Sequence, residues 1–199
     1  MATFLQEEFL RLGLSISPEI HEKLETYVRE LEHWNRRINL TSLRGVDLVR
    51  RLVVEPGWIG TKLQMSGNLM DVGSGNGCPA VPLYLLCGLN RVDLVEARTR
   101  RAAFLRHIAK QLGADGMVIH KLRLEDMKEL SVAVEWVTFQ GVDPTPKFLE
   151  ALGSLVPPTT RIVWITSKEV PAWGSAARIS VPNSKTVAWV AQLDNALSV

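Results

Sequence analysis

The chain has 199 residues, of which 46% are hydrophobic and 22% are charged, and its formal net charge is +2. Its length suits one domain with an appendage, and its composition excludes a disordered or low-complexity chain. No apolar run approaches the roughly 20 residues that a membrane span needs, and the N-terminus lacks the regions of a secretory signal. We therefore expect a cytoplasmic protein without membrane contact.

The two cysteines of the sequence, Cys78 and Cys87, belong neither to a CxxC pair nor to a cluster with histidines. Their number and spacing argue against a disulfide framework and against a zinc site. We expect no bound metal, and a reducing compartment fits this use of cysteine.

The first sixty residues have the periodicity of amphipathic helices. Apolar residues recur at helical spacing over residues 4–12 and 18–38, and Ser17 precedes a proline and a glutamate, which is the pattern of a helix start. Another helix is expected after Gly45. The sequence therefore predicts an N-terminal helical subdomain over residues 1–60.

From Asn68 onward, short apolar runs alternate with helical patterns. Such alternation is typical of βαβ units, which build a mostly parallel sheet with helices on both faces. An apolar run near the C-terminus predicts an antiparallel hairpin that closes the sheet. This α/β domain is expected over residues 61–199. We expect strands at residues 69–73, 91–96, 117–122, 133–139, 161–166 and 186–193, and helices at residues 79–88, 99–113 and 145–155.

The turn after the first expected strand is rich in glycine and reads "GSGNG" from Gly73 to Gly77, with a helix expected to open at Pro79. A dinucleotide-binding GxGxxG turn would have its third glycine where this chain has Cys78, and no GKS or GKT of a nucleoside triphosphatase follows. Alternate glycines let the backbone approach a ligand along the whole turn. The turn therefore predicts a ligand without a pyrophosphate.

Glu96 ends the second expected strand, 23 residues after Gly73. A carboxylate in this position can accept hydrogen bonds from both hydroxyls of a ribose. Together the turn and the acid indicate an adenosine-type ligand without phosphates, and S-adenosylmethionine is our candidate. Its amino-acid end would meet the turn, and its adenine would lie near the end of the third strand. The candidate cofactor-binding residues are Asp71, Gly73, Ser74, Gly75, Glu96, Leu124 and Glu125.

Two segments are rich in basic residues although the net charge is small. Six arginines lie from Arg29 to Arg51, and five basic residues without any acid lie between residues 97 and 114. Either cluster alone is also typical of a solvated helix face, but together they indicate a surface for nucleic acid. Trp34 could be a base-stacking platform, but its helical spacing with apolar neighbours favours the core. The candidate RNA contacts are Arg36, Arg37, Arg51, Arg100 and Arg101.

Four segments together carry a family resemblance: "HWNRRINLTSLR" (33–44), "DVGSGNGCPAVPL" (71–83), "LVEARTRRAAFLRHI" (94–108) and "RLED" (123–126). They resemble the family of ribosomal RNA small subunit methyltransferase G, also called glucose-inhibited division protein B. The W-N-x-x-x-N-L-T-S pattern in the first segment is the most specific of them, since generic methyltransferases lack it. The resemblance is clear over residues 20–130.

The resemblance implies a Rossmann-like class I S-adenosylmethionine-dependent methyltransferase that acts on N7 of a guanine in 16S ribosomal RNA, with that RNA or the small ribosomal subunit as its partner. It carries cofactor contacts onto Gly73, Leu124 and Glu125, and onto Cys78, where an apolar residue is usual. Guanine N7 has a lone pair and loses no proton on methylation, so we expect positioning and no catalytic acid or base. The sequence does not give the oligomeric state, and a monomer is our expectation.

Several positions depart from the family pattern. Gln140, a further cofactor-site candidate, stands where the family usually has an arginine, and Lys168, a further RNA candidate, follows Ser167 where a K-G pair is usual. Arg51 and Val54 replace a histidine and an acid. The sequence therefore leaves three functions open: a divergent RNA methyltransferase, a non-catalytic or re-purposed paralogue that binds RNA or the ribosome, and a methyltransferase for a small molecule or a protein.

Overall fold

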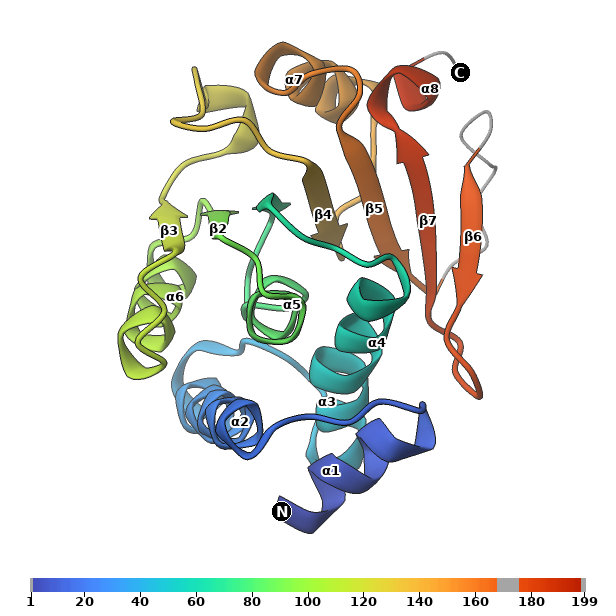
Figure 1. Ribbon diagram of the computed structural model, residues 1–199. Helices are drawn as coiled ribbons and strands as arrows, with labels where there is room; N and C mark the ends of the chain where they lie inside the picture. Colours follow the sequence, from blue (N-terminus) through green and yellow to red (C-terminus); the bar gives the residue numbers. More distant parts are fainter. Residues whose placement is uncertain (1, 168–175, 198–199) are drawn as a thin grey trace.

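Figure 1 shows a computed structural model of the chain, which describes residues 2–167 and 176–197. Its centre is a seven-stranded sheet of order β3-β2-β1-β4-β5-β7-β6. The first five strands run parallel, and β7 pairs antiparallel with both β5 and β6. The predicted parallel sheet and its closing hairpin are thereby confirmed. The strands are β1 (Asn68–Val72), β2 (Arg91–Val95), β3 (Met117–His120), β4 (Trp136–Gln140), β5 (Arg161–Thr166), β6 (Ala177–Ser180) and β7 (Val187–Gln192).

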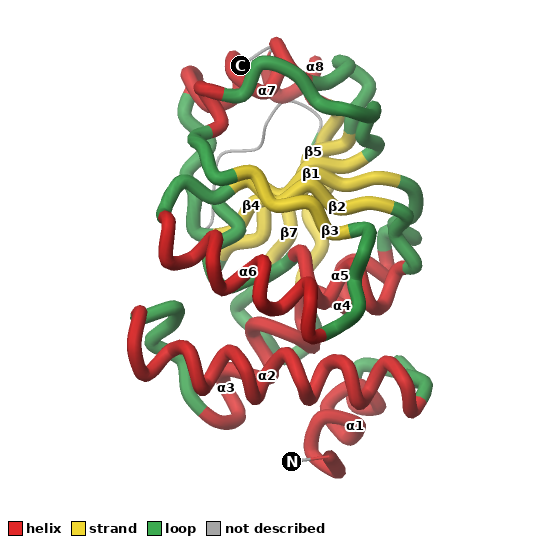
Figure 2. The backbone as a smooth tube through the Cα atoms, turned by 90° about the vertical axis from the view of Figure 1, so that its left-hand side faces the viewer, coloured by secondary structure: helices red, strands yellow, loops and turns green. Residues whose placement is uncertain are grey.

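Helices form layers on both faces of the sheet (Figure 2). Helices α4, α5 and α6 cover one face, α7 and α8 cover the other, and α1, α2 and α3 lie outside the first of these layers (Figure 2). The short helix α8 was not predicted. The helices are α1 (Ala2–Arg11), α2 (Pro18–Ile38), α3 (Gly45–Val49), α4 (Glu55–Lys62), α5 (Ala80–Cys87), α6 (Thr99–Gln111), α7 (Pro146–Leu155) and α8 (Leu193–Leu197), with a π-helical turn η1 (Arg50–Val54) and a 3-10 turn η2 (Leu124–Asp126).

The apolar core divides at the sheet. Successive strand residues point to opposite faces, so Leu69 joins the cluster under α4, α5 and α6, whereas Met70 joins the cluster under α7 and α8. The first cluster continues into the outer helical layer through Leu24 and Leu31 of α2, both 0% exposed. Because this core is shared, the N-terminal helices hold a fixed position relative to the sheet.

The predicted helix start before Pro18 is confirmed. The hydroxyl of Ser17 accepts a hydrogen bond from the amide of Ile20 at 3.3 Å, and Pro18 occupies the first turn of α2. The helix expected after Gly45 is also confirmed, as the continuous run of α3, η1 and α4. The helix expected to open at Pro79 begins at Ala80, with Pro79 as its N-cap.

Two charged groups fasten the run of α3, η1 and α4 to its neighbours. Arg50 donates to both carboxylate oxygens of Glu8 in α1, at 2.6 and 2.8 Å. Glu55, which is 7% exposed, accepts hydrogen bonds from the hydroxyls of Ser184 and Thr186 in the turn of the closing hairpin. The run therefore ties the N-terminal layer to the far end of the sheet. Within residues 2–167 and 176–197, none of the helices combines the length and apolar character of a membrane span.

Candidate functional site

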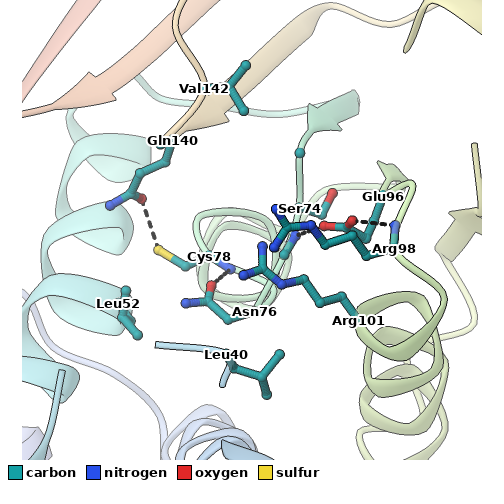
Figure 3. Close-up of a pocket in the computed structure, with 13 residues that line it drawn as sticks. Leu40, Leu52, Ser74, Asn76, Cys78, Glu96, Arg98, Arg101, Gln140 and Val142 are labelled. Atoms are coloured by element: carbon teal, nitrogen blue, oxygen red, sulfur yellow. Dashed lines mark hydrogen bonds between the residues drawn. The ribbon is translucent and has the colours of Figure 1, made fainter. Parts of the chain in front are cut away.

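A cavity of about 450 Å³ opens at the carboxyl ends of β1, β2 and β4 (Figure 3). It lies where the strand order reverses, between β1 and β4, which is where open α/β sheets bind their ligands. Its volume is in the range of cofactor sites. The residues that line it are Leu40, Leu52, Gly73, Ser74, Gly75, Asn76, Cys78, Glu96, Arg98, Arg101, Gln140, Gly141 and Val142.

The glycine turn forms the floor of this cavity. Gly73, Gly75 and Gly77 have φ values of +75°, +50° and +90°, which side chains rarely adopt. Space is also limiting, because a Cβ atom on Gly73 would lie 2.5 Å from Val142 Cγ2, and one on Gly77 would lie 2.8 Å from Val81 Cγ2. The glycines therefore let the backbone pass close to both the cavity and the core.

Glu96 joins the glycine turn to the start of α6. Its side chain is 5% exposed, Oε2 accepts a hydrogen bond from the Gly75 amide at 3.0 Å, and Oε1 accepts one from the Arg98 amide at 2.7 Å. A carboxylate offers about four acceptor positions, so each oxygen keeps capacity for a ligand hydroxyl. The carboxylate thus organises the site and borders the cavity at once.

Asp71 lies beneath the turn and does not line the cavity. Its side chain is 1% exposed, Oδ1 accepts a hydrogen bond from the Thr138 hydroxyl at 2.7 Å, and Oδ2 has no partner among the described residues. Burial raises the pKa of Asp71 to about 7, and the Thr138 hydrogen bond opposes this while the charge of Glu96 adds to it. The Asp71 side chain is therefore hydrogen-bonded to β4, and its backbone carbonyl, which accepts from the Ser74 hydroxyl at 2.9 Å, contacts the turn.

The side of the cavity next to β4 is neutral. The thiol of Cys78 donates to Gln140 Oε1 at 3.0 Å, and Leu52 of the π-helical turn lies beside this pair (Figure 3). Burial raises the pKa of the Cys78 thiol well above its ordinary value, so the sulfur stays protonated and can donate. π-helical turns recur at functional sites, and this one lines the cavity.

The W-N-x-x-x-N-L-T-S pattern builds the turn that follows α2. Asn35, 5% exposed, donates from Nδ2 to the Thr41 carbonyl and accepts from the Thr41 amide, both at 2.9 Å. Asn39 ends α2 in the left-handed conformation, with φ 49°. This fixed turn places Leu40 in the wall of the cavity. The segment that carries the most specific resemblance therefore has a structural role at the site.

Helix α2 also contacts the glycine turn directly. The hydroxyl of Tyr27, which is 0% exposed, donates to the carbonyl of Asn76 at 2.9 Å. Burial raises the pKa of Tyr27 well above its ordinary value, so this hydroxyl keeps its proton. The N-terminal helical layer therefore supports the floor of the cavity.

Most of the predicted cofactor-binding residues meet at the cavity, and three lie elsewhere. Asp71 is buried beneath it, Leu124 is 4% exposed within the cluster on the opposite face of the sheet, and Glu125 lies exposed on η2. Their proposed cofactor contacts stay predictions. The predicted residues that line the cavity are Gly73, Ser74, Gly75, Cys78, Glu96 and Gln140.

The predicted RNA-binding residues are spread more widely. Arg101 lines the cavity, whereas the exposed side chains of Arg36, Arg37, Arg51 and Arg100 lie outside it. The position of Lys168 lies outside the described residues.

Several cavity residues were not singled out from the sequence as contacts of the cofactor. Asn76 stands inside the glycine turn and Arg98 lies two residues after Glu96, so both could have been found by their position. Leu52 and Val142 carry no local signal, because only the packing of η1 and of the loop after β4 against the turn brings them there.

The sheet order, the glycine turn and the acid after β2 define the Rossmann-like fold of class I S-adenosylmethionine-dependent methyltransferases. A methyltransferase from Aquifex aeolicus described as dependent on this cofactor has a TM-score of 0.56 at 14% identity, over 76% of this chain and 96% of that one. A mutant of MtNAS in complex with S-adenosylmethionine has a TM-score of 0.57 at 13% identity, over 95% of this chain and 76% of that one. At such identities the likeness shows the fold.

A family model described as rRNA small subunit methyltransferase G matches residues 20–178, and the chain belongs to this family. The enzyme of that name from Dichelobacter nodosus is 32% identical over 130 residues, which cover 62% of this chain and 59% of that protein. The one from Geobacter is 26% identical over 161 residues, which cover 80% of this chain and 74% of that protein. The chain thus spans less than two thirds of the length of the first of these relatives.

Proposed function

We propose that this protein is an S-adenosylmethionine-dependent methyltransferase that transfers a methyl group to N7 of a guanine in 16S ribosomal RNA. The observation that carries the proposal is the cavity at the strand-order reversal, which combines the glycine turn with the acceptor carboxylate of Glu96. Membership of the rRNA small subunit methyltransferase G family supplies the substrate class.

The residues present fit S-adenosylmethionine. Glu96 would accept hydrogen bonds from the ribose hydroxyls, and the turn from Gly73 to Gly75 would face the amino-acid end of the cofactor. This cofactor has no phosphate groups that the turn would have to bind. Leu40 and Leu52 would cover apolar parts of the cofactor. When bound, the cofactor supplies a methyl group activated by a sulfonium. The full set that we propose to contact or support it is Asp71, Gly73, Ser74, Gly75, Cys78, Glu96, Leu124, Glu125 and Gln140.

The proposed reaction needs no proton transfer from the protein. A bond forms between the N7 lone pair of guanine and the methyl carbon while the carbon–sulfur bond breaks, and the positive charge passes from sulfur to the base. Glu96 is engaged by two backbone amides, which disfavours a role as a general base. The role left to the side chains is to hold the reactants in line and to exclude water.

RNA binding is proposed for the basic residues around the cavity and on the neighbouring helices. Arginine contacts with phosphates give an affinity that falls steeply with salt and carries little sequence preference. The proposed RNA contacts among them are Arg36, Arg37, Arg51, Arg100 and Arg101, and Lys168, outside the described residues, is proposed from the sequence alone.

Two measurements test the function. Calorimetric titration with S-adenosylmethionine and with S-adenosylhomocysteine should give binding at one site per chain. Labelled methyl transfer to 16S RNA in undermethylated small ribosomal subunits, followed by nucleoside analysis, should yield 7-methylguanosine. Cofactor binding combined with label in another nucleoside, or with label in protein alone, would contradict the proposed substrate.

A non-catalytic RNA-binding role is the second candidate, and the neutral β4 side of the cavity favours it. Gln140 is hydrogen-bonded to a thiol at the position where the resemblance leads us to expect an arginine. Under this alternative the protein binds the small subunit and the cofactor but transfers no methyl group. The methyl-transfer assay separates the two candidates.

We further propose that residues 1–60 act as a helical subdomain that faces the RNA, and that residues 61–199 form the methyltransferase domain. The contacts of Tyr27 and Leu40 at the site support a joint role for the two parts. A ribosomal RNA substrate would place the protein in the cytoplasm, and we propose that it acts as a monomer.

A further inference from the structure

A second hollow, which we call the Trp34 groove, lies between α2 and α6. It measures about 300 Å³ and is lined by Glu30, His33, Trp34, Arg37, Ile38 and His107. Trp34 is half-buried, and its ring packs edge-on against Phe104 with centroids 5.7 Å apart. The expected core position of Trp34 is therefore correct for one part of the ring, whereas another part borders the groove.

The lining of the Trp34 groove has the chemistry of a site for a nucleic-acid base. Unpaired bases stack on aromatic rings and on guanidinium planes, and the imidazole of His107 lies 5.3 Å from the Trp34 ring at 42°. A carboxylate can accept hydrogen bonds from the amino groups of a base, and Glu30 lies in the wall, paired with His107 at 2.8 Å. The exposed guanidinium of Arg37 adds a cation for the backbone phosphate.

The groove is a close neighbour of the proposed cofactor cavity along the same two elements. On the α2 side, Ile38 lines the groove and Leu40 lines the cavity. On α6, His107 lines the groove and Arg101, six residues earlier, lines the cavity, which corresponds to about 9 Å along the helix axis. Neighbouring nucleotides of one extended RNA strand can therefore occupy both hollows.

We propose that the Trp34 groove binds a base of single-stranded RNA that neighbours the base held at the cavity. This proposal rests on the proposed function in one respect, which is that the base held at the cavity is the guanine to be methylated. Stacking in the groove would fix the position of the strand, which phosphate contacts alone do not do.

The test uses the full chain and a fluorescein-labelled pentaribonucleotide with a central guanosine, followed by anisotropy with and without saturating S-adenosylhomocysteine. Trp34→Leu keeps an apolar contact with Phe104 and removes the stacking ring, and it should weaken binding about 5- to 100-fold. Trp34→Phe should recover most of the loss. Lys147→Ala, which removes an exposed cation from α7 on the opposite face of the sheet, should change the affinity by less than about twofold.

A series of pentamers with one abasic position each identifies the base in the groove. One abasic pentamer should bind the unsubstituted protein as weakly as the intact pentamer binds Trp34→Leu. That abasic pentamer should bind Trp34→Leu with the same affinity, because the base and the ring that stack on each other are lost together. If Trp34→Leu lowers the affinity by the same factor for the intact pentamer and for every abasic pentamer, no single base occupies the groove and the proposal is overturned. So would an intact pentamer that fails to bind the unsubstituted protein.

Folding and cofactor binding are read separately. Calorimetry with S-adenosylhomocysteine reports on the cavity, so a failure of the proposed function leaves the pentamer result readable. The indole N–H resonance of Trp34, identified by its loss in Trp34→Phe, should shift with the intact pentamer and not with the matching abasic one. Absence of this shift in the unsubstituted protein overturns the proposal even where Trp34→Leu fails to fold.

Discussion

The cavity has two walls that differ in charge and in how the chain builds them (Figure 3). The Glu96 wall consists of the glycine turn, Glu96, Arg98 and Arg101, which follow one another along the consecutive elements β1, α5, β2 and α6. The Gln140 wall consists of residues from separate segments, and among the described residues that form it none is charged. Its members are Leu40, Leu52, Cys78, Gln140, Gly141 and Val142.

This difference indicates a division of roles. A carboxylate held by two backbone amides is preorganised and resists displacement, which suits the recognition of one constant part of a ligand. A neutral wall with one hydrogen bond between a thiol and an amide offers little electrostatic selection. Equivalent side-chain removals on the two walls should therefore have very different effects.

Glu96→Ala should have the largest effect. It leaves the buried amide of Gly75 and the part-buried amide of Arg98 without an acceptor, at about 1–3 kcal/mol for the first and less for the second, so the free energy of unfolding should fall by about 2–4 kcal/mol. S-adenosylmethionine affinity should fall at least about 10- to 150-fold, which is the loss expected for about 1.5–3 kcal/mol. Glu96→Gln, which keeps one acceptor oxygen, should be intermediate. Urea denaturation and calorimetry measure the two effects.

Glu135→Ala is the matched control for Glu96. Its carboxylate also accepts from a backbone amide, that of Asn68 at 2.6 Å, but at the amino ends of β1 and β4, away from the cavity at their carboxyl ends. This variant should lose stability and keep its cofactor affinity. A similar loss of affinity in both variants would show that the Glu96 effect reflects general loosening of the sheet.

Gly73→Ala tests whether the two walls touch. The added Cβ would lie 2.5 Å from Val142 Cγ2, at a residue whose φ is +75°. Overpacking and left-handed strain together should cost about 2–4 kcal/mol in unfolding free energy. A second change, Val142→Ala, should restore the part that is due to the contact. Gly88→Ala, with φ +60° and nothing within 4 Å, should show the strain alone, and an equal cost in both glycine variants would mean that the walls are independent.

Asp71→Asn tests the electrostatics beneath the Glu96 wall. The pKa of Asp71 is raised from 3.8 to about 7 by burial, so between these values the folded state holds a proton that the unfolded state releases. Stability attributable to Asp71 therefore falls as the pH rises through this window and is constant above it. Relative to the original protein, Asp71→Asn should gain about 2–3 kcal/mol between pH 5 and pH 8. Urea denaturation at the two pH values measures this change, and a constant difference between the two proteins would exclude the raised pKa.

The two walls also differ in how far the sequence predicted them. The Glu96 wall follows from local spacing, because a glycine turn and an acid at the ends of adjacent parallel strands must meet at one edge of the sheet. The Gln140 wall depends on tertiary packing: Leu52 lies on a π-helical turn and Val142 in a loop, and no periodicity links either of them to residue 73. The parallel sheet and its closing hairpin were predictable from the alternation of strand and helix patterns, whereas the strand order was not predicted and the half-buried state of Trp34 depends on the packing of α2 against α6.

Gln140→Ala should have the smallest effect of the series. It removes the nearer of two acceptors of the Cys78 thiol and leaves the Arg51 carbonyl at 3.9 Å, and a thiol is a weak donor, so the unfolding free energy should change by less than about 1 kcal/mol. Cofactor affinity should change by less than about tenfold, in contrast to Glu96→Ala.

Cys78→Ala breaks the same hydrogen bond from the other side and serves as the matched variant. Its cost in unfolding free energy is set mainly by lost packing, since Cys78 is 6% exposed. If Gln140→Ala instead weakens S-adenosylmethionine binding as strongly as Glu96→Ala, the neutral wall carries cofactor recognition and the division between the walls is wrong. Methyl transfer that is lost while cofactor affinity stays constant would instead assign Gln140 to the placement of the RNA base.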